Sequence, residues 1–249
     1  MIKSLTFAAA LALLAPAALA EPTHVMVRAQ ALDAKFIGDH MGGVEITLTD
    51  ARTGALLAKG LTRGGAGDTP RIMRAPRQRG EALSDKDAAG FDAVLDLRQP
   101  TLVRADGVGP MGKPGAAIHV SSTLWVIPGR DVTGDGLVLS FPGLVIEPAA
   151  APAADGTLQV TAKVTPMCGC PIEAGGLWDA ANYRIEATLM KGPRILAHAP
   201  MRFTGRTSEY EAALPATAPG RYKLRIVATD AKTPNAGMVE QDVRIPRAR

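Results

Sequence analysis

The residues best suited to chemistry are the two cysteines of the chain, Cys168 and Cys170, which one glycine separates and which directly follow Met167. A proline flanks this stretch on each side, which favours an extended, non-helical loop. The intervening Gly169 permits a bend that turns both sulfurs to one side. Two thiols and a thioether placed in this way predict either a disulfide or a soft-metal site.

Three interpretations of this cysteine loop remain open. In an oxidising compartment Cys168 and Cys170 would pair, although so small a ring removes little chain entropy and stabilises little. A readily reduced disulfide would suit thiol–disulfide exchange, but no thioredoxin-like strand–helix–strand pattern surrounds it. As a metal site, Met167, Cys168 and Cys170 would select copper as Cu(I), with a histidine or Met201 as a further ligand. Zinc fits less well because a closed zinc site usually needs four nitrogen or sulfur ligands.

The remaining residues give no support for an enzyme. The four histidines are not spaced as a metal pair, no nucleophile elbow is present, and no carboxylate pair stands out. The glycine-rich stretch 64–69 lacks the Gly-Lys-Ser/Thr ending of a phosphate loop, and no helix pattern follows it. Asp135-Gly136 resembles the start of a calcium loop, but a hairpin turn is the better interpretation. We therefore expect a non-enzymatic protein.

The N-terminus has the features of an export signal. Lys3 precedes an apolar run over 5–14, and Ala18-Leu19-Ala20 forms a cleavage site before Glu21. Residues 1–20 are thus predicted to be a signal peptide, and the mature protein to be periplasmic or secreted. The apolar run is too short for a membrane span, and no later run matches it.

The formal net charge is only +4 and the charges are scattered, which is too little to indicate a nucleic-acid partner. One basic cluster stands out, in a charged and unpatterned stretch. It is either a solvated loop or a contact for an anionic partner. Its members are Arg71, Arg74, Arg77 and Arg79.

The elements that must position the cysteine loop are β-strands. With 26 glycines and 19 prolines, the chain favours turns and short strands, and alternating apolar residues mark most of the strands. The length suggests two domains. We expect a first β-sandwich over 21–147, an Ala/Pro-rich linker over 148–156 and an Ig-like sandwich over 157–249. Strands are predicted at 23–32, 44–49, 55–61, 91–97, 102–103, 117–127, 137–146, 158–164, 183–190, 194–199, 208–214, 220–230 and 238–245.

Two hairpins carry resemblances to known modules. GVEITLTDARTGALLAKGLT (43–62) resembles the early hairpin of carboxypeptidase-regulatory-like and transthyretin-like modules. PGRYKLRIVATDAKTPNAG (219–237) resembles the late hairpin of bacterial Ig-like and fibronectin-type modules, with Tyr222 at the tyrosine position. Both resemblances imply tandem β-sandwiches and no activity. In such a module Trp178 is expected to fill the space between the sheets.

Two hypotheses for function follow. One is an exported binding protein that holds copper through Met167, Cys168 and Cys170. The other is an interaction module that docks on another exported protein and carries a Cys168–Cys170 disulfide. The sequence predicts no other cofactor and does not define the oligomeric state.

Overall fold

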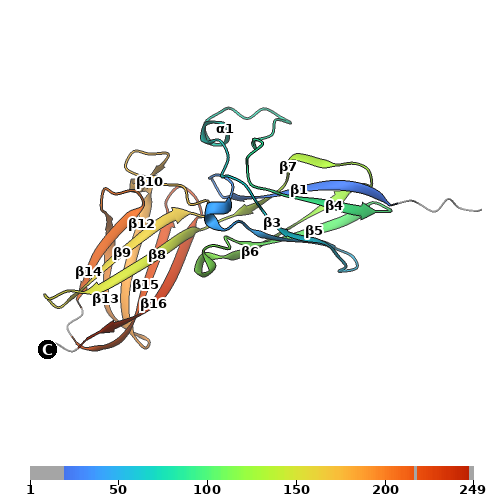
Figure 1. The fold of residues 1–249 in the computed structure, drawn as a ribbon. Helices are drawn as coiled ribbons and strands as arrows, with labels where there is room; N and C mark the ends of the chain where they lie inside the picture. Colours follow the sequence, from blue (N-terminus) through green and yellow to red (C-terminus); the bar gives the residue numbers. More distant parts are fainter. Residues whose placement is uncertain (1–19, 216–217, 247–249) are drawn as a thin grey trace, which may run out of the picture.

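The protein is built almost entirely of β-strands. The computed structural model describes residues 20–215 and 218–246, which contain sixteen strands, three 3₁₀ turns and one α-helix, α1 (Thr69–Met73). Strands β1–β7 and β8–β16 form two groups arranged end to end (Figure 1). The predicted all-β class is confirmed. No helix in the described residues has the length and apolarity needed to cross a membrane. Of the predicted signal peptide, residues 1–19 lie outside the described part.

The first group contains two sheets that face each other. One has the order β4-β1-β7: β4 (Phe91–Leu97), β1 (Glu21–Ala31) and β7 (Val132–Phe141). The other has the order β3-β2-β5-β6: β3 (Leu56–Leu61), β2 (Glu45–Asp50), β5 (Thr101–Gly109) and β6 (Ile118–Val126). A methyl group added at Gly107 of β5 would lie 2.8 Å from Leu139 and 3.0 Å from Phe141, both on β7. Gly107 therefore allows the sheets to pack closely.

The second group is a continuous series of seven paired strands. Its order is β16-β15-β12-β13-β14-β9-β8. The bounds are β16 (Ala236–Ile245), β15 (Gly220–Asp230), β12 (Tyr183–Lys191), β13 (Arg194–Phe203), β14 (Glu209–Pro215), β9 (Thr157–Pro166) and β8 (Leu144–Pro152). Only two residue pairs join β13 to β14, so the series bends there into two layers. The result is sandwich-like, and two short strands, β10 (Ile172–Glu173) and β11 (Trp178–Asp179), lie at one end.

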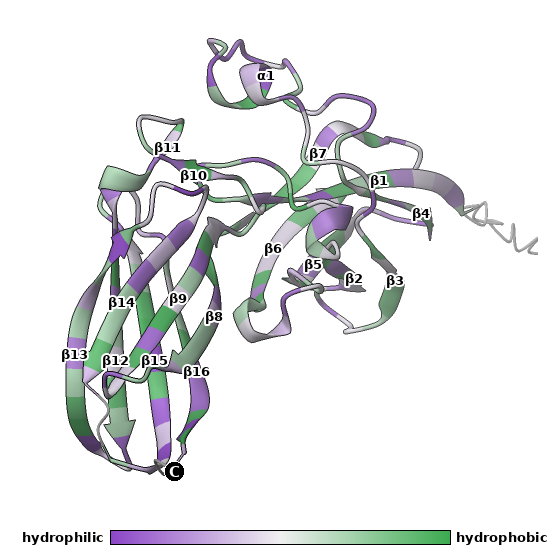
Figure 2. Ribbon diagram, turned by 60° about the vertical axis from the view of Figure 1, so that its left-hand side comes forward, coloured by the Kyte–Doolittle hydropathy of each residue, from purple (hydrophilic) through white to green (hydrophobic). Residues whose placement is uncertain are grey.

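The core follows the alternation in the sequence. Along β9, Leu158, Val160, Ala162 and Val164 are buried, and Figure 2 shows hydrophobic and hydrophilic residues alternating along these strands. Buried apolar residues from both groups of strands belong to one continuous core cluster. The two groups therefore pack against each other at the junction where β7 leads into β8.

The predicted linker at 148–156 is wrong. Pro148 to Pro152 is the second half of β8, and it pairs with β9 through registers such as Ala149↔Thr161 and Pro152↔Leu158. Residues 153–156 make the hairpin turn. Proline is tolerated because β8 is an end strand of the series, where one side of the backbone needs no ladder partner. The second group of strands thus begins at Leu144.

The predicted hairpin turn at Asp135-Gly136 is also wrong, because both residues lie within β7. The pairing of β1 with β7 jumps from Val132 to Leu137, so the intervening residues bulge out of the ladder. The Asp135 carboxylate accepts hydrogen bonds from the backbone N–H groups of Leu83 (2.8 Å) and Ser84 (2.7 Å). The bulge therefore anchors the long loop between β3 and β4.

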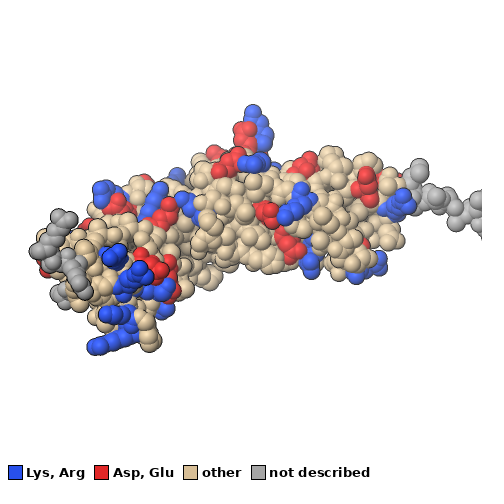
Figure 3. Space-filling model, turned by 60° about the horizontal axis from the view of Figure 1, so that its bottom comes forward, with Lys and Arg blue, Asp and Glu red and all other residues tan. Residues whose placement is uncertain are grey.

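That loop, residues 62–90, carries α1 and projects from the body of the protein (Figure 1). Arg28 of β1 is buried and donates hydrogen bonds to the carbonyl oxygens of Ala88 and Ala89 at the base of the loop. On the face shown in Figure 3, basic and acidic side chains are interspersed. Arg74, Arg77 and Arg79, from the predicted basic cluster, are exposed.

Candidate functional site

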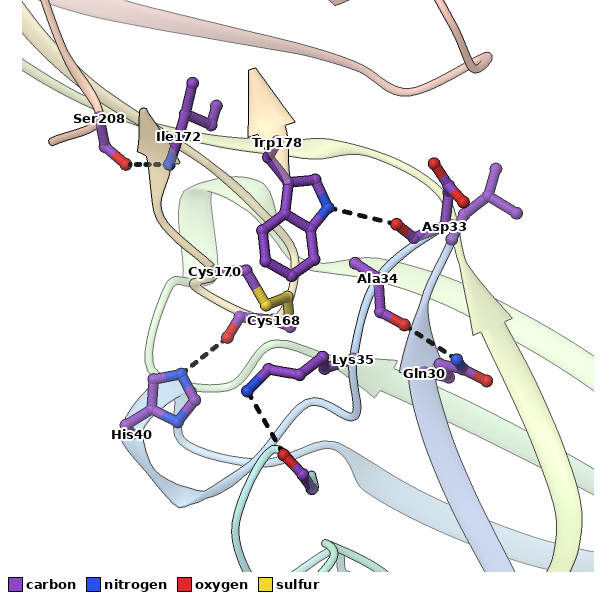
Figure 4. The surroundings of a disulfide bond; sticks show 12 residues. Gln30, Asp33, Ala34, Lys35, His40, Cys168, Cys170, Ile172, Trp178 and Ser208 are labelled. Atoms are coloured by element: carbon purple, nitrogen blue, oxygen red, sulfur yellow. Dashed lines mark hydrogen bonds between the residues drawn. A yellow bond between two sulfur atoms is a disulfide. The ribbon is translucent and has the colours of Figure 1, made fainter. Parts of the chain in front are cut away.

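The cysteine loop lies at the junction of the two groups of strands. It connects β9 to β10, and Cys168 and Cys170 form a disulfide with a Cα–Cα distance of 5.4 Å (Figure 4). Both cysteines are buried, with exposures of 0% and 3%. The disulfide, one of the three interpretations of the sequence, is therefore the state that the structure shows. Because both sulfurs are buried, rapid thiol–disulfide exchange with a partner protein is disfavoured as the function of this loop, although a small dithiol in excess can still reduce the bond.

Local hydrogen bonds fix the shape of the loop. The N–H of Gly169 donates to the Pro166 carbonyl at 2.8 Å, and Gly169 has φ +69°, a conformation that favours glycine. On the far side, Ile172 and the fully buried Ser208 exchange two hydrogen bonds, from Ile172 N–H to Ser208 Oγ (3.0 Å) and from Ser208 N–H to the Ile172 carbonyl (2.8 Å). The loop is thus a tight turn tied to the start of β14.

Two residues of the first group of strands contact the loop. His40 and Met41 belong to the 3₁₀ turn η1 (Asp39–Met41). His40 donates a hydrogen bond from Nε2–H to the carbonyl oxygen of Cys168 at 2.7 Å, across 128 positions of sequence. A methyl group added at Gly169 would lie 2.6 Å from Met41 Sδ and 2.9 Å from His40 Nε2. Gly169 therefore lets the loop approach this imidazole and this thioether closely.

Further polar contacts hold the same junction. Trp178 is buried on β11, and its indole N–H donates to the Asp33 carbonyl of the first group of strands at 3.2 Å. The buried Asn235 bridges the groups of strands: its Nδ2 donates to the Leu32 carbonyl (3.0 Å), and its Oδ1 accepts from Gly143 N–H (2.8 Å). These bonds satisfy backbone groups that would otherwise be buried without a partner.

The end of the loop is shaped by Asp179. Its carboxylate accepts hydrogen bonds from the backbone N–H groups of Ala181 and Gly175, both at 3.1 Å. These hydrogen bonds stabilise the charged carboxylate and lower the pKa of Asp179. Desolvation raises the pKa, but by less. Asp179 thereby turns the chain from β11 into η3 (Ala180–Asn182).

The third predicted ligand, Met167, is buried beside Cys168, but its side chain packs in another direction. Its methyl carbon lies 2.5 Å from where a methyl group at Gly143 would be, on the β8 side of the loop. Met201, the other methionine considered from the sequence, lies on β13, where it pairs with Ile185 of β12.

The other three histidines are engaged elsewhere. His24 Nδ1 lies 3.1 Å from Asp92, His119 Nε2 lies 2.8 Å from Asp106, and His198 Nδ1 lies 3.0 Å from the Thr188 hydroxyl. All three are on strand faces away from the loop. Of the histidines, only His40 is shown in contact with the cysteine loop among the residues described.

In the disulfide-bonded form, no group of three or more His, Cys, Asp and Glu side chains within 20–215 and 218–246 is arranged to hold a metal ion. Sulfur-bearing residues are nevertheless close together here, because Met167 directly precedes Cys168 and Met41 Sδ lies 2.6 Å from where a methyl group at Gly169 would be. Both methionines and both cysteines are at most 4% exposed. With the disulfide opened, the thiolates and thioethers would be soft donors of the kind that select Cu(I), and the His40 imidazole is a nitrogen donor that also suits copper.

Sequence reasoning identified the cysteine loop but missed its partners. The sequence allowed for a histidine ligand without identifying His40, and it did not indicate Met41, although an adjacent histidine and methionine are two donors that suit copper. Asn235 and Ser208 carried no sequence signal. No protein-family model matches the chain, and neither does any curated protein.

Proposed function

We propose that this is an exported, non-enzymatic binding protein that holds copper in its cysteine loop once the loop is reduced. In this proposal residues 1–20 are a cleaved signal peptide, and the mature protein is periplasmic or secreted. The two groups of strands are tandem Ig-like β-sandwich domains that meet at Leu144. Cys168 and Cys170 supply thiolates, the strong ligands, and Met167 supplies a weaker thioether.

One observation supports this function above others: the buried concentration of soft donors around the loop. The exposures are 0% for Cys168, 2% for Met167, 3% for Cys170 and 4% for Met41. Thiolates and thioethers select Cu(I) over the hard cations that carboxylates bind. A buried site also excludes water and competing ligands, which tunes the chemistry of a bound metal.

The experiment is metal analysis combined with a thiol count on protein isolated from the periplasm or medium without added reductant or metal. Copper near one equivalent, with two thiols that react only after the metal is removed, would support the proposal. Metal-free protein with no reactive thiol, which also fails to bind Cu(I) after reduction, would refute it.

A second candidate is an interaction module that docks on another exported protein. Two observations favour it: the Cys168–Cys170 disulfide itself, and the projecting α1 loop with exposed Arg74, Arg77 and Arg79. An exposed basic loop suits an anionic partner surface. This candidate predicts copper-free protein whose partner is released by Arg→Ala changes in the loop and by salt.

A further inference from the structure

We propose that His40 and Met41 complete the metal site of the reduced loop, so that the bound ion joins the two groups of strands. This inference rests on the proposed function and extends it. Two thiolates from a Cys-Gly-Cys turn leave a Cu(I) ion open on one side. An imidazole and a thioether from a segment 128 positions away lie against this turn: His40 Nε2 bonds to the Cys168 carbonyl oxygen, and Met41 Sδ lies close to Gly169.

The contact is direct and close. Gly169 separates the two cysteines, and a methyl group placed on it would come within 3 Å of both His40 Nε2 (2.9 Å) and Met41 Sδ (2.6 Å). Figure 4 shows the His40 imidazole directed at the Cys168 carbonyl beside the disulfide. Both candidate ligands therefore already lie against the turn that carries the sulfurs.

The backbone holds this pair of residues in place before any metal arrives. Met41 N–H donates to the Gly38 carbonyl at 3.0 Å, and Gly112 N–H donates to the Met41 carbonyl at 2.8 Å. Gly42 closes the 3₁₀ turn in a left-handed conformation, with its N–H bonded to the Asp39 carbonyl. A site on such fixed backbone needs little reorganisation when the ion binds.

The same geometry distinguishes Met41 from Met167 as candidate ligands. The methyl carbon of Met167 packs against Gly143, whereas the sulfur of Met41 lies against Gly169 between the cysteines. Met41 is therefore the thioether whose sulfur lies against the turn between the cysteines. The remaining histidines do not compete, because each pairs with a carboxylate or hydroxyl on its own strand face.

The site forms in two steps: a dithiol reduces the disulfide, and Cu(I) then binds. A dithiol attacks the Cys168–Cys170 bond and leaves as a cyclic disulfide, so that two electrons and two protons pass to the cysteines. Cu(I) binding then releases the two thiol protons to solvent. His40 is exposed, so the proton on its Nε2 can move through water to Nδ1, which leaves Nε2 free to coordinate the ion.

The disulfide consequently regulates the site. In the oxidised form the sulfurs are bonded to each other, and His40 donates to the Cys168 carbonyl. In the reduced form His40 exchanges that hydrogen bond for the metal. In the oxidised form, the hydrogen bond from His40 to Cys168 links the two groups of strands. In the reduced form, the copper ion would link them at the same place.

The test is Cu(I) titration of the full exported chain, reduced with a dithiol that is then removed, against a chromophoric Cu(I) chelator under nitrogen. His40→Gln keeps an amide donor for the Cys168 carbonyl but removes the imidazole. Met41→Leu removes the sulfur at similar volume. We expect each to weaken Cu(I) binding at least tenfold, and Met167→Leu to weaken it less than Met41→Leu. His198→Gln and Met201→Leu, which change the same residue types elsewhere, should leave the affinity unchanged.

The outcomes separate the inference from the proposed function. If Cys168→Ser and Cys170→Ser abolish binding while His40→Gln and Met41→Leu retain it, the inference is refuted and the proposed function stands. If the cysteine variants bind as well as wild type, both are refuted. X-ray absorption of the wild-type copper form needs no variant to fold: a mixed nitrogen and sulfur shell supports the inference, and a sulfur-only shell overturns it.

Discussion

Gly169→Ala is the most informative single change, because the structure predicts two separable costs. The first is the backbone: Gly169 has φ +69°, and a left-handed residue other than glycine costs about 1–2 kcal/mol. The second is steric, since the new methyl would lie 2.6 Å from Met41 Sδ and 2.9 Å from His40 Nε2. Overpacking of this kind costs roughly 1–3 kcal/mol.

Gly175→Ala supplies the matched control within the same segment. Gly175 has φ +65°, but a methyl group there would meet nothing within 4 Å. It should therefore show the backbone cost alone. Urea unfolding of oxidised protein should give Gly169→Ala a loss in free energy of unfolding larger than that of Gly175→Ala by about 1–3 kcal/mol. The excess should shrink in a Met41→Ala background, where the obstructing side chain is gone.

Equal losses for the two glycine variants would refute the packing of the loop against η1. An excess for Gly169→Ala that persists unchanged in the Met41→Ala background would also count against it, because the clash would then lie with other atoms. Either result would remove the geometric basis for His40 and Met41 as ligands.

Three further changes test other parts of the account. Asn235→Ala removes both side-chain hydrogen bonds, to Leu32 and from Gly143, and should cost about 2–4 kcal/mol in urea unfolding. Asn182→Ala, which leaves both of these bonds intact, should cost less. Burial raises the pKa of Asp135, but the hydrogen bonds from Leu83 and Ser84 and the positive charge of Arg28 together outweigh it and lower the pKa. The contribution of Asp135 to stability is therefore complete above the pKa of the unfolded chain and is lost as the pH falls through the lower folded value. Asp135→Asn should accordingly flatten the acid side of the stability–pH curve measured by denaturant unfolding, and a curve parallel to wild type would contradict this. Intact-mass analysis of exported protein should show Glu21 as the first residue, and retention of Met1 would contradict the predicted cleavage.

Much of the fold could be predicted because alternation of apolar and polar residues reports directly on strands. Val25 and Val27 in β1 and Leu158 and Val160 in β9 are buried at the positions that the pattern indicated. The errors have physical causes. The Ala/Pro-rich segment at 148–152 looked like a linker, yet an end strand tolerates proline.

The candidate site could be predicted only in part. The sulfur-bearing residues within 167–170 are close together in the sequence, so the sequence alone identifies them. Their partners come from tertiary packing, which places His40 and Met41 against a loop that begins more than 120 positions later. Similarly, Asp135-Gly136 has local turn chemistry, but the parallel pairing of β1 with β7 turns it into a bulge. Spacing in the sequence carries no information on such contacts.

The most direct test of the central claim is Cu(I) stoichiometry and affinity measured on reduced wild-type protein and on the Cys168→Ser/Cys170→Ser double variant. The account predicts about one Cu(I) per wild-type chain and loss of most of that affinity in the variant, because soft-metal affinity resides in the thiolate bonds. Folding should survive, since a ring this small adds little chain-entropy stabilisation. Copper binding that is unchanged in the double variant would contradict the claim, as would reduced wild-type protein that binds no Cu(I).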